Sequence, residues 1–193
     1  MSEVHVTPSA EQIRDLVAEP LTRDAFAAFG DVIEVPGGGG RTANDGTAIR
    51  YDDIAALALT AEDGRPTLDL FRVKPARLPL ECRILERHPL SSQAFVPVGA
   101  APFLVVVAPA GGDRPDAATT RAFVTDGRQG VNYRPGVWHH PVLALGAETN
   151  FVMMGRADDG RDCDIAPFCG GAGVRMSHIP DLDSLIQIGR AHV

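Results

Sequence analysis

Residues 130–142 read Gly130-Val-Asn-Tyr-Arg-Pro-Gly-Val-Trp-His-His-Pro-Val142, and this stretch decides the fold. A Pro135-Gly136 turn separates short runs of β-forming residues, and two adjacent histidines follow it. Neighbouring side chains on a strand point to opposite faces, so only one of His139 and His140 can point into a closed β structure. The stretch therefore predicts a tight connection between strands that carries one histidine inward.

A second stretch upstream belongs with the first. It reads Leu85-Glu-Arg-His-Pro-Leu-Ser-Ser-Gln-Ala-Phe-Val-Pro-Val98 and places Glu86, His88 and Gln93 on a strand and its exit. Together the two stretches resemble the half-motifs of a cupin barrel. In that pattern a first motif supplies His-x-His, Glu and Gly, and a second supplies a proline-glycine turn followed by His. The resemblance implies that His139 points inward and that His140 lies on the outer face or behind the site.

Two ligands of the cupin pattern are changed in this chain. Glu86 stands in place of the first histidine, and Gln93 stands in place of the glutamate. The metal ligands implied by the resemblance are then Glu86, His88, Gln93 and His139. This set suits a borderline divalent ion such as Ni, Mn, Fe or Zn less tightly than a three-histidine site, because an amide oxygen is neutral. Two cases stay open: a divalent cofactor such as Ni or Mn, or no metal.

Each candidate side chain also has a simpler interpretation. His88 can be a strand-end histidine bonded to the backbone. Tyr133 and Trp138 are large enough to be core residues, yet each has a polar tip that can line a substrate pocket. Arg72 and Lys74 are two positions apart and so share one strand face. That face is either solvated or points into the barrel, where the two cations would hold a substrate carboxylate.

Strands dominate the rest of the chain. They are predicted at Asp31–Val35, Leu68–Val73, Leu80–Leu85, Ala94–Val98, Phe103–Val107 and Phe151–Met154. Short helices are predicted from the capping box at Ser9 through Val17, at Thr22–Phe29, and near Asp116–Val124. Closely spaced short strands bounded by proline or glycine predict an all-β fold. We expect a cupin-like double-stranded β-helix, a jelly-roll barrel with short peripheral helices.

Composition limits the partners. The chain has 193 residues and a net charge of −7, without a basic run, so nucleic acid and anionic membranes are poor partners and a small molecule is the expected ligand. No apolar run approaches the ~20 residues that cross a bilayer, and no secretion signal is visible, which predicts a cytoplasmic protein. Three cysteines without a close pair argue against a disulfide framework and a thiolate zinc site.

The chain divides into three predicted parts: an N-terminal extension at 1–19, a barrel domain at 20–168, and a glycine-rich tail at 169–193. The tail ends Ile188-Gly-Arg-Ala-His-Val193, which is what a widely used sequencing adapter encodes in one reading frame. We interpret part or all of the tail as read-through. The alternative is an ordinary disordered tail, and in either case His178 and His192 are not counted as ligands.

A closer resemblance rests on five blocks. They are Pro20-Leu-Thr-Arg-Asp-Ala-Phe-Ala-Ala-Phe-Gly-Asp-Val-Ile33, Phe71-Arg-Val-Lys-Pro75, residues 85–97, Phe103-Leu-Val-Val-Val-Ala-Pro109 and residues 130–141. Over about 20–164 the chain resembles the ureidoglycolate lyase family, also called ureidoglycolate hydrolase. The resemblance implies a cupin-like homodimer that cleaves ureidoglycolate to glyoxylate and urea, a late step of allantoin and purine-nitrogen breakdown.

The implied reaction fits the candidate residues. Cleaving a carbinolamide needs a base for the hydroxyl proton, an acid for the leaving urea nitrogen and a group that holds the carboxylate. Glu86, His88 and His139 can fill the first two roles or bind a metal, and Arg72 and Lys74 are the candidates for the carboxylate. Gln93, Tyr133 and Trp138 are further substrate-binding candidates.

Two other functions stay open at this point. One is a metal-dependent cupin oxygenase or isomerase that acts on another small hydroxy acid, because Glu86, His88 and His139 can also form a facial triad. The other is a non-catalytic small-molecule-binding cupin.

Overall fold

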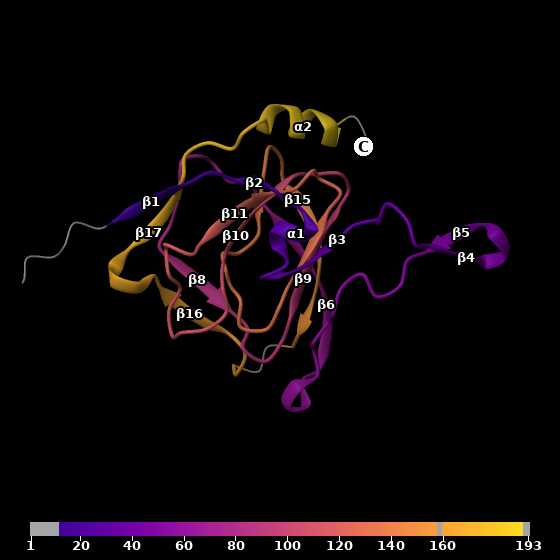
Figure 1. The fold of residues 1–193 in the computed structure, drawn as a ribbon, viewed down its shortest axis with the longest axis horizontal. Coiled ribbons are helices and arrows are strands. Elements are labelled where there is room, and N and C mark those ends of the chain that lie inside the picture. The colour runs from indigo at the N-terminus through magenta and orange to yellow at the C-terminus, as the bar shows by residue number, and fades with distance from the viewer. Residues whose placement is uncertain (1–11, 158–159, 191–193) are drawn as a thin grey trace, which may run out of the picture.

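The structure is a computed structural model that describes residues 12–157 and 160–190. Its body consists of two sheets that face each other (Figure 1), antiparallel except where β2 pairs with β11 in parallel. The β10 sheet contains β16 (Asp164–Pro167), β8 (Ile84–Arg87), β13 (Trp138–His139), β10 (Phe103–Ala108), β11 (Arg121–Val124) and β2 (Glu19–Pro20), in this order, with β14 (Leu143–Ala144) also paired to β10. The β9 sheet contains β3 (Gly30–Ile33), β12 (Gly130–Tyr133), β9 (Gln93–Val98), β15 (Thr149–Arg156) and β6 (Pro66–Val73), in this order. The predicted all-β fold is confirmed, with the two sheets as the walls of a barrel.

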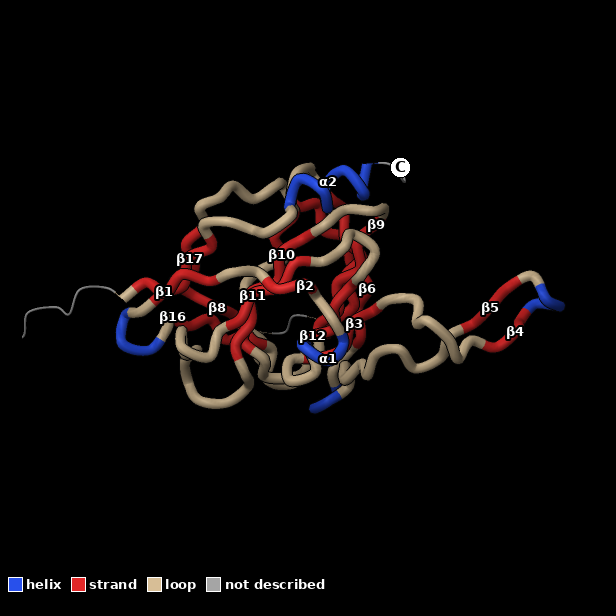
Figure 2. The backbone as a smooth tube through the Cα atoms, turned by 45° about the horizontal axis from the view of Figure 1, so that its top comes forward, coloured by secondary structure: helices blue, strands red, loops and turns tan. Residues whose placement is uncertain are grey.

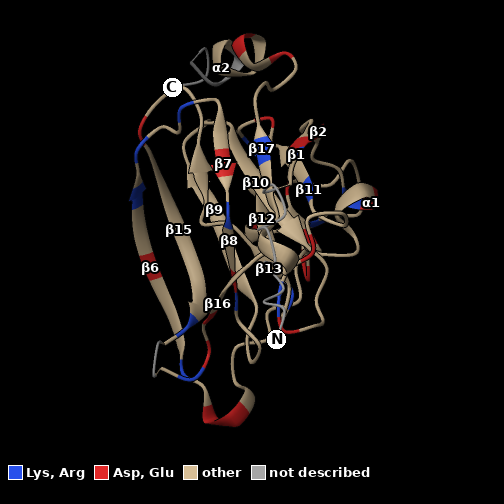
Figure 3. Cartoon of the chain, turned by 90° about the vertical axis from the view of Figure 1, so that its left-hand side faces the viewer, with Lys and Arg blue, Asp and Glu red and all other residues tan. Residues whose placement is uncertain are grey.

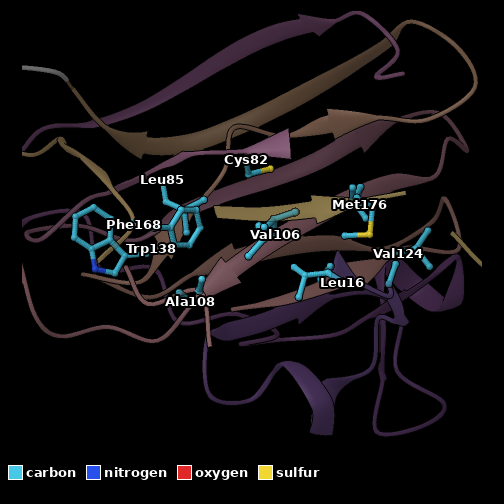
Figure 4. Packing of buried hydrophobic residues seen from close by; sticks show 14 of the residues in the cluster. Leu16, Cys82, Leu85, Val106, Ala108, Val124, Trp138, Phe168 and Met176 are labelled. Carbon is cyan, nitrogen blue, oxygen red and sulfur yellow. The ribbon is translucent and has the colours of Figure 1, made fainter. Parts of the chain in front are cut away.

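A third sheet covers the outer face of the β10 sheet. This β17 sheet contains β1 (Ile13–Leu16), β17 (Gly173–Met176) and β7 (Leu80–Cys82), with β1 parallel to β17. Alternate residues of β10 therefore pack on two sides. Leu104, Val106 and Ala108 pack with Trp138, Cys82 and Met176 between the β10 and β17 sheets (Figure 4). Phe103, Val105 and Val107 pack on the other side, in the barrel interior. Burial on both faces explains why β10 contains no polar residue.

Aromatic side chains fill the barrel interior. Phe103 and Phe151 meet edge to face from opposite sheets, with ring centroids 5.1 Å apart. The short helix α1 (Arg23–Phe26) places Phe26 against Phe123, at 5.5 Å and 87°. Thr22 caps α1 by accepting a hydrogen bond from the Ala25 backbone N–H. Each buried phenylalanine contributes roughly 1.5–3 kcal/mol, so this cluster holds the two sheets together.

Smaller elements surround the barrel. The hairpin of β4 (Arg41–Ala43) and β5 (Ala48–Arg50) extends away from the barrel as an arm (Figures 1 and 2). The helix α2 (Leu182–Arg190) crosses one end of the barrel, opposite the single-turn 3-10 helix at Ala61–Asp63. Two further single turns lie at Asn44–Gly46 and Cys169–Gly171. None of the helices in the described parts of the chain is long and apolar enough to cross a membrane.

Most predicted strands are confirmed, but three local predictions are wrong. The helix predicted up to Val17 is strand β1, because residues 13–16 pair with β17. Of the capping box predicted at Ser9–Gln12, residues 9–11 lie outside the described residues. The helix predicted near Asp116–Val124 is a turn capped by Asp116 followed by β11, which pairs along β10. The strand predicted at Leu80–Leu85 breaks at Arg83, where the chain passes from the β17 sheet to the β10 sheet. The helix predicted at Thr22–Phe29 is confirmed in shorter form as α1.

The boundaries at 19/20 and 168/169 stay predictions. The structure adds that the segment after 168 contributes β17 to the third sheet and places Val174, Met176 and Ile179 in the core. In the described part of the chain these residues cover Cys82 and Leu16. The segment after 168 therefore covers part of the outer face of the β10 sheet.

Candidate active site

Strand pairing brings Glu86 and His139 together. His139 is the cross-strand partner of Glu86 on β8 and of Val107 on β10. Directly paired residues share a face, and Val107 belongs to the barrel interior, so the Glu86 and His139 side chains lie inside the barrel. The carboxylate Oε1 of Glu86 is 3.6 Å from His139 Nε2.

His88 and Gln93 complete the group. His88 follows β8 two residues after Glu86, so it projects from the same face, and its ring centroid is 5.4 Å from that of His139. Gln93 begins β9 in the opposite sheet and places its Oε1 3.1 Å from His139 Nε2. One ligand atom from each of Glu86, His88 and His139 lies within 4.8 Å of the other two. The four residues predicted as metal ligands therefore converge, from both walls of the barrel.

Backbone hydrogen bonds fix which imidazole nitrogens face the group. His139 Nδ1 lies 2.9 Å from the Val137 carbonyl, and His88 Nδ1 lies 2.5 Å from the Asp162 carbonyl. Carbonyl oxygens only accept, so both Nδ1 atoms carry a proton, and in the neutral form of each ring Nε2 presents a lone pair. The Nε2 of His88 is buried and has no hydrogen-bond partner among the described residues.

The resulting donor set fits a divalent cation. His139 Nε2 and Gln93 Oε1 face each other as two acceptors, with the Glu86 carboxylate beside them and the unpartnered His88 Nε2 in the same group. A cation between these lone pairs would satisfy all of them, and imidazole with carboxylate suits divalent transition metals. Glu86, His88 and His139 thus form a triad compatible with a divalent metal.

Burial shifts the acid–base properties of the site. It lowers the pKa of His139 to about 3, against the opposing effect of the Val137 carbonyl, so this imidazole is neutral at physiological pH. It raises the pKa of Glu86, although the nearby His88 and His140 act in the opposite direction. The pKa of the Tyr133 phenol is also raised, mainly by burial and further by Glu86.

Two cavities open on this group. One of about 600 Å³ is lined by Lys74, Glu86, Phe95 and Val142 among others. The other, of about 430 Å³, is lined by Arg65, Asp69, Ser91 and Asp162 among others. Both include His88, Gln93 and Phe71 in their walls, and both have the size of small-molecule sites.

The structure brings most predicted site residues together, but not all. Tyr133 stacks on His139, and Lys74 is exposed in the wall of the larger cavity. Arg72 also borders that cavity, but its guanidinium bonds Asn150 at 3.1 Å and lies 3.7 Å from Glu148, with its side chain 72% exposed. Trp138 is on the opposite face of β13 from His139, packed in the cluster under the β17 sheet. Arg87 stacks on its ring there, 4.4 Å from the centroid.

Sequence reasoning missed Asp162 and Ser91. The Asp162 carboxylate accepts hydrogen bonds from the Leu90 N–H and the Ser91 hydroxyl, both at 2.6 Å. Asp162 is 74 residues from His88 along the chain and belongs to no recognisable motif. Only the pairing of β16 with β8 brings them together, so no local signal identifies this contact.

Known proteins similar to this chain indicate its family. The family model described as ureidoglycolate lyase matches residues 13–174. A protein named ureidoglycolate lyase from Burkholderia mallei (strain NCTC 10229) is 53% identical over 150 residues, covering 78% of this chain and 87% of that protein. One of the same name from Pseudomonas syringae pv. tomato (strain ATCC BAA-871 / DC3000) is 47% identical over 152 residues, covering 79% and 89%.

A solved dTDP sugar isomerase from Desulfovibrio desulfuricans G20 is similar at a TM-score of 0.40 and 19% identity, covering 73% of this chain and 83% of that one. The matched region of the family model contains all the strands of the two barrel sheets and the converging residues Glu86, His88, Gln93 and His139. The chain belongs to the ureidoglycolate lyase family.

Proposed function

We propose that the protein is an enzyme that cleaves ureidoglycolate to glyoxylate and urea, in the breakdown of allantoin and purine nitrogen. The observation that carries the proposal is the convergence of Glu86, His88 and His139 in a chain of the ureidoglycolate lyase family. The cavities beside these side chains match a small, polar substrate better than a macromolecule.

The reaction needs two proton transfers and no water. The substrate hydroxyl loses its proton as the carbonyl of glyoxylate forms, the carbon–nitrogen bond breaks, and the leaving urea nitrogen gains a proton. The neutral His139 and the lone pair on His88 Nε2 are acceptors for the hydroxyl proton. Glu86, whose pKa is raised by burial, is suited to hold the proton that the nitrogen receives.

A divalent metal would be held by Glu86, His88, His139 and the amide oxygen of Gln93, and we propose Ni or Mn. When bound, it would lower the pKa of a coordinated hydroxyl and stabilise the developing oxyanion. The neutral Gln93 amide contributes less attraction than a carboxylate, which predicts weak binding.

The substrate carboxylate needs a cation near this group. Of the two residues predicted for it, Lys74 has the better position, since it borders the cavity that Glu86, His88 and Gln93 also line. The guanidinium of Arg72 is instead engaged with Asn150 and Glu148. We therefore assign the carboxylate to Lys74 first and keep Arg72 and Tyr133 as residues to be tested by substitution. Trp138, predicted to bind substrate, faces away from His139 and lines neither cavity.

The decisive experiment measures the products. Purified protein given racemic ureidoglycolate should release glyoxylate and urea in equal amounts, with no oxygen consumed. Ammonia in place of urea would indicate an amidohydrolase-type reaction, and oxygen uptake would indicate a cupin oxygenase; either result overturns the proposal. Glu86→Gln, which keeps the side-chain shape and removes the charge, serves as the inactive control.

We also propose that the protein is a homodimer in the cytoplasm. The odd number of cysteines argues against a disulfide framework and supports a reducing compartment. The strand β6 supports the dimer: it ends the β9 sheet, and among described strands it pairs with β15 alone (Figure 3). Leu68 and Leu70 project from it and are 71% and 76% exposed. A long apolar edge strand is normally covered.

Light scattering of the purified protein tests the dimer. We expect wild-type protein to be dimeric and Leu70→Glu to be monomeric. The control is Ile165→Glu, which alters another exposed apolar residue, 64% exposed, on the edge strand β16 of the other sheet and should remain dimeric. A monomeric wild type, or a dimeric Leu70→Glu, would exclude this interface.

A further inference from the structure

The loop between β15 and β16 brings one buried carboxylate to the turn that follows β8. Asp162 is 6% exposed, and its two carboxylate oxygens accept separate hydrogen bonds, from the Leu90 N–H and from the Ser91 hydroxyl, both at 2.6 Å. Pro89 has no N–H, so Leu90 supplies the first backbone donor after His88. Asp162 therefore accepts a hydrogen bond from the first backbone N–H that follows His88 in the chain.

The same residue also contacts the His88 ring. The backbone carbonyl of Asp162 accepts the Nδ1–H of His88 at 2.5 Å. The turn and the ring are thus both attached to one residue from a distant segment. Hydrogen bonds to an ionised carboxylate are roughly twice as strong as neutral ones, so the side chain is the firmer of the two attachments.

Resting on the function proposed above, we propose that Asp162 is the positioning residue for His88. Its carboxylate fixes the turn, and this holds its own carbonyl in register with Nδ1. The carbonyl then keeps the proton on Nδ1 and directs the lone pair of Nε2 toward Glu86 and His139, where Nε2 is buried without another partner. Asp162 does not touch the reacting atoms and acts only through His88.

Three substitutions separate this role from general stabilisation. Asp162→Ala removes both carboxylate bonds, whereas Asp162→Asn keeps an oxygen that can accept from the Leu90 N–H. Ser91→Ala removes one bond and leaves Asp162 in place. The matched control is Asp164→Asn, two residues further on, whose half-exposed carboxylate pairs with Arg87 at 2.8 Å outside the site.

The measurements are nitrogen NMR of labelled histidine in metal-free protein, calorimetric titration with Ni²⁺ alone, and steady-state kinetics with ureidoglycolate. In wild type and Asp164→Asn, His88 should be a single Nδ1–H tautomer. In Asp162→Ala it should become a mixture, with Ni²⁺ affinity and kcat each lower by about 10- to 100-fold, as for other residues that orient a histidine ligand. KM should change less than kcat. Ser91→Ala should show a smaller loss, and Asp162→Asn should recover most of it.

The remaining outcomes test the positioning role of Asp162 separately from the proposed cleavage of ureidoglycolate. A folded Asp162→Ala protein with an unchanged tautomer and unchanged Ni²⁺ affinity overturns the positioning role. If Asp162→Ala does not fold, an unchanged His88 tautomer in Ser91→Ala, together with unaltered Ni²⁺ affinity and kcat of that variant, overturns it equally. If wild type does not cleave ureidoglycolate but the tautomer responds as described, the proposed reaction fails and the positioning role stands.

Discussion

Tyr133 lies flat against His139, with ring centroids 4.2 Å apart and ring planes 10° from parallel. The two residues come from opposite walls of the barrel, since Tyr133 ends β12 in the β9 sheet and His139 ends β13 in the β10 sheet. The stack thus joins the two walls where Glu86 and Gln93 also approach the imidazole. It holds the His139 ring on one side, and the Val137 carbonyl holds its Nδ1.

Tyr133→Phe tests whether the phenol has a second role. Its hydroxyl is buried without a partner among the described residues, so removing it should leave the unfolding free energy unchanged or higher, because an unpaired buried polar group costs ~1–3 kcal/mol. If the hydroxyl binds substrate, kcat/KM should fall about fivefold, the value of one hydrogen bond of about 1 kcal/mol. The control is Tyr51→Phe, at the only other tyrosine of the chain. Unchanged kinetics for both variants would leave Tyr133 a packing residue.

Substitution of His139 and of His140 by alanine should lower kcat to very different extents. Only His139 points into the barrel, so His139→Ala should lower kcat by ~10²-fold or more while the protein remains folded. The His140 ring bonds its neighbouring backbone on the outer face, and His140→Ala should have a much smaller effect. Steady-state kinetics with circular dichroism of each variant makes the comparison. Equal, small losses would mean that neither imidazole takes part in the chemistry.

The sequence predicts the site where local periodicity determines it. Glu86 and His88 are two residues apart and so share a face, and adjacent His139 and His140 cannot. Local periodicity does not determine how Trp138 packs or that residues 13–16 form β1. Trp138 packs in the cluster that Val174 and Met176 of β17 also join, and residues 13–16 become a strand only because β17, about 160 residues later, pairs with them. A helical pattern of short range cannot reveal such a partner.

The metal is best tested at Gln93. Its amide oxygen takes the place of a carboxylate, so any bound ion should be lost on dialysis against chelator, and activity should fall and return on addition of Ni or Mn. Gln93→Glu should bind Ni²⁺ more tightly in calorimetry, because a charged oxygen attracts a divalent cation more strongly than an amide does. Wild-type protein that elemental analysis shows to be metal-free, yet fully active, would require Glu86, His88 and His139 to act alone.

Measurements of KM show which cation binds the substrate carboxylate. Lys74 has no ion-pair partner in the described part of the chain and borders the larger cavity, so Lys74→Ala should raise KM about tenfold or more, the loss of a charge-assisted hydrogen bond of roughly 1.5–3 kcal/mol. Arg72→Ala, which removes an exposed cation two residues away, should alter KM little. An effect at Arg65→Ala instead would place the carboxylate in the smaller cavity.

Cys82 reports whether the segment after 168 covers the barrel. It pairs with Val174 of β17 and is 2% exposed, and burial raises its pKa from 9.0 to about 11. In the full chain, Cys169 should react with a thiol reagent at pH 8 while Cys82 does not. In a chain ending at residue 180, Cys82 should be protected from the reagent as it is in the full chain. One ending at 168 loses the buried Val174, Met176 and Ile179, each worth roughly 1.5–3 kcal/mol, and should expose Cys82 or unfold.

The raised pKa of Cys82 also sets the sign of a pH effect. The unfolded chain ionises this thiol near its ordinary pKa, whereas the folded chain keeps it protonated to a higher pH, so the unfolded state binds fewer protons in between. This contribution to stability is fully present below about pH 9 and is lost as the pH rises toward 11. Urea unfolding of wild type and Cys82→Ala at pH 8 and pH 10 measures it. Wild type should lose more stability than the variant over this interval, and equal losses would show that β17 does not shield the thiol.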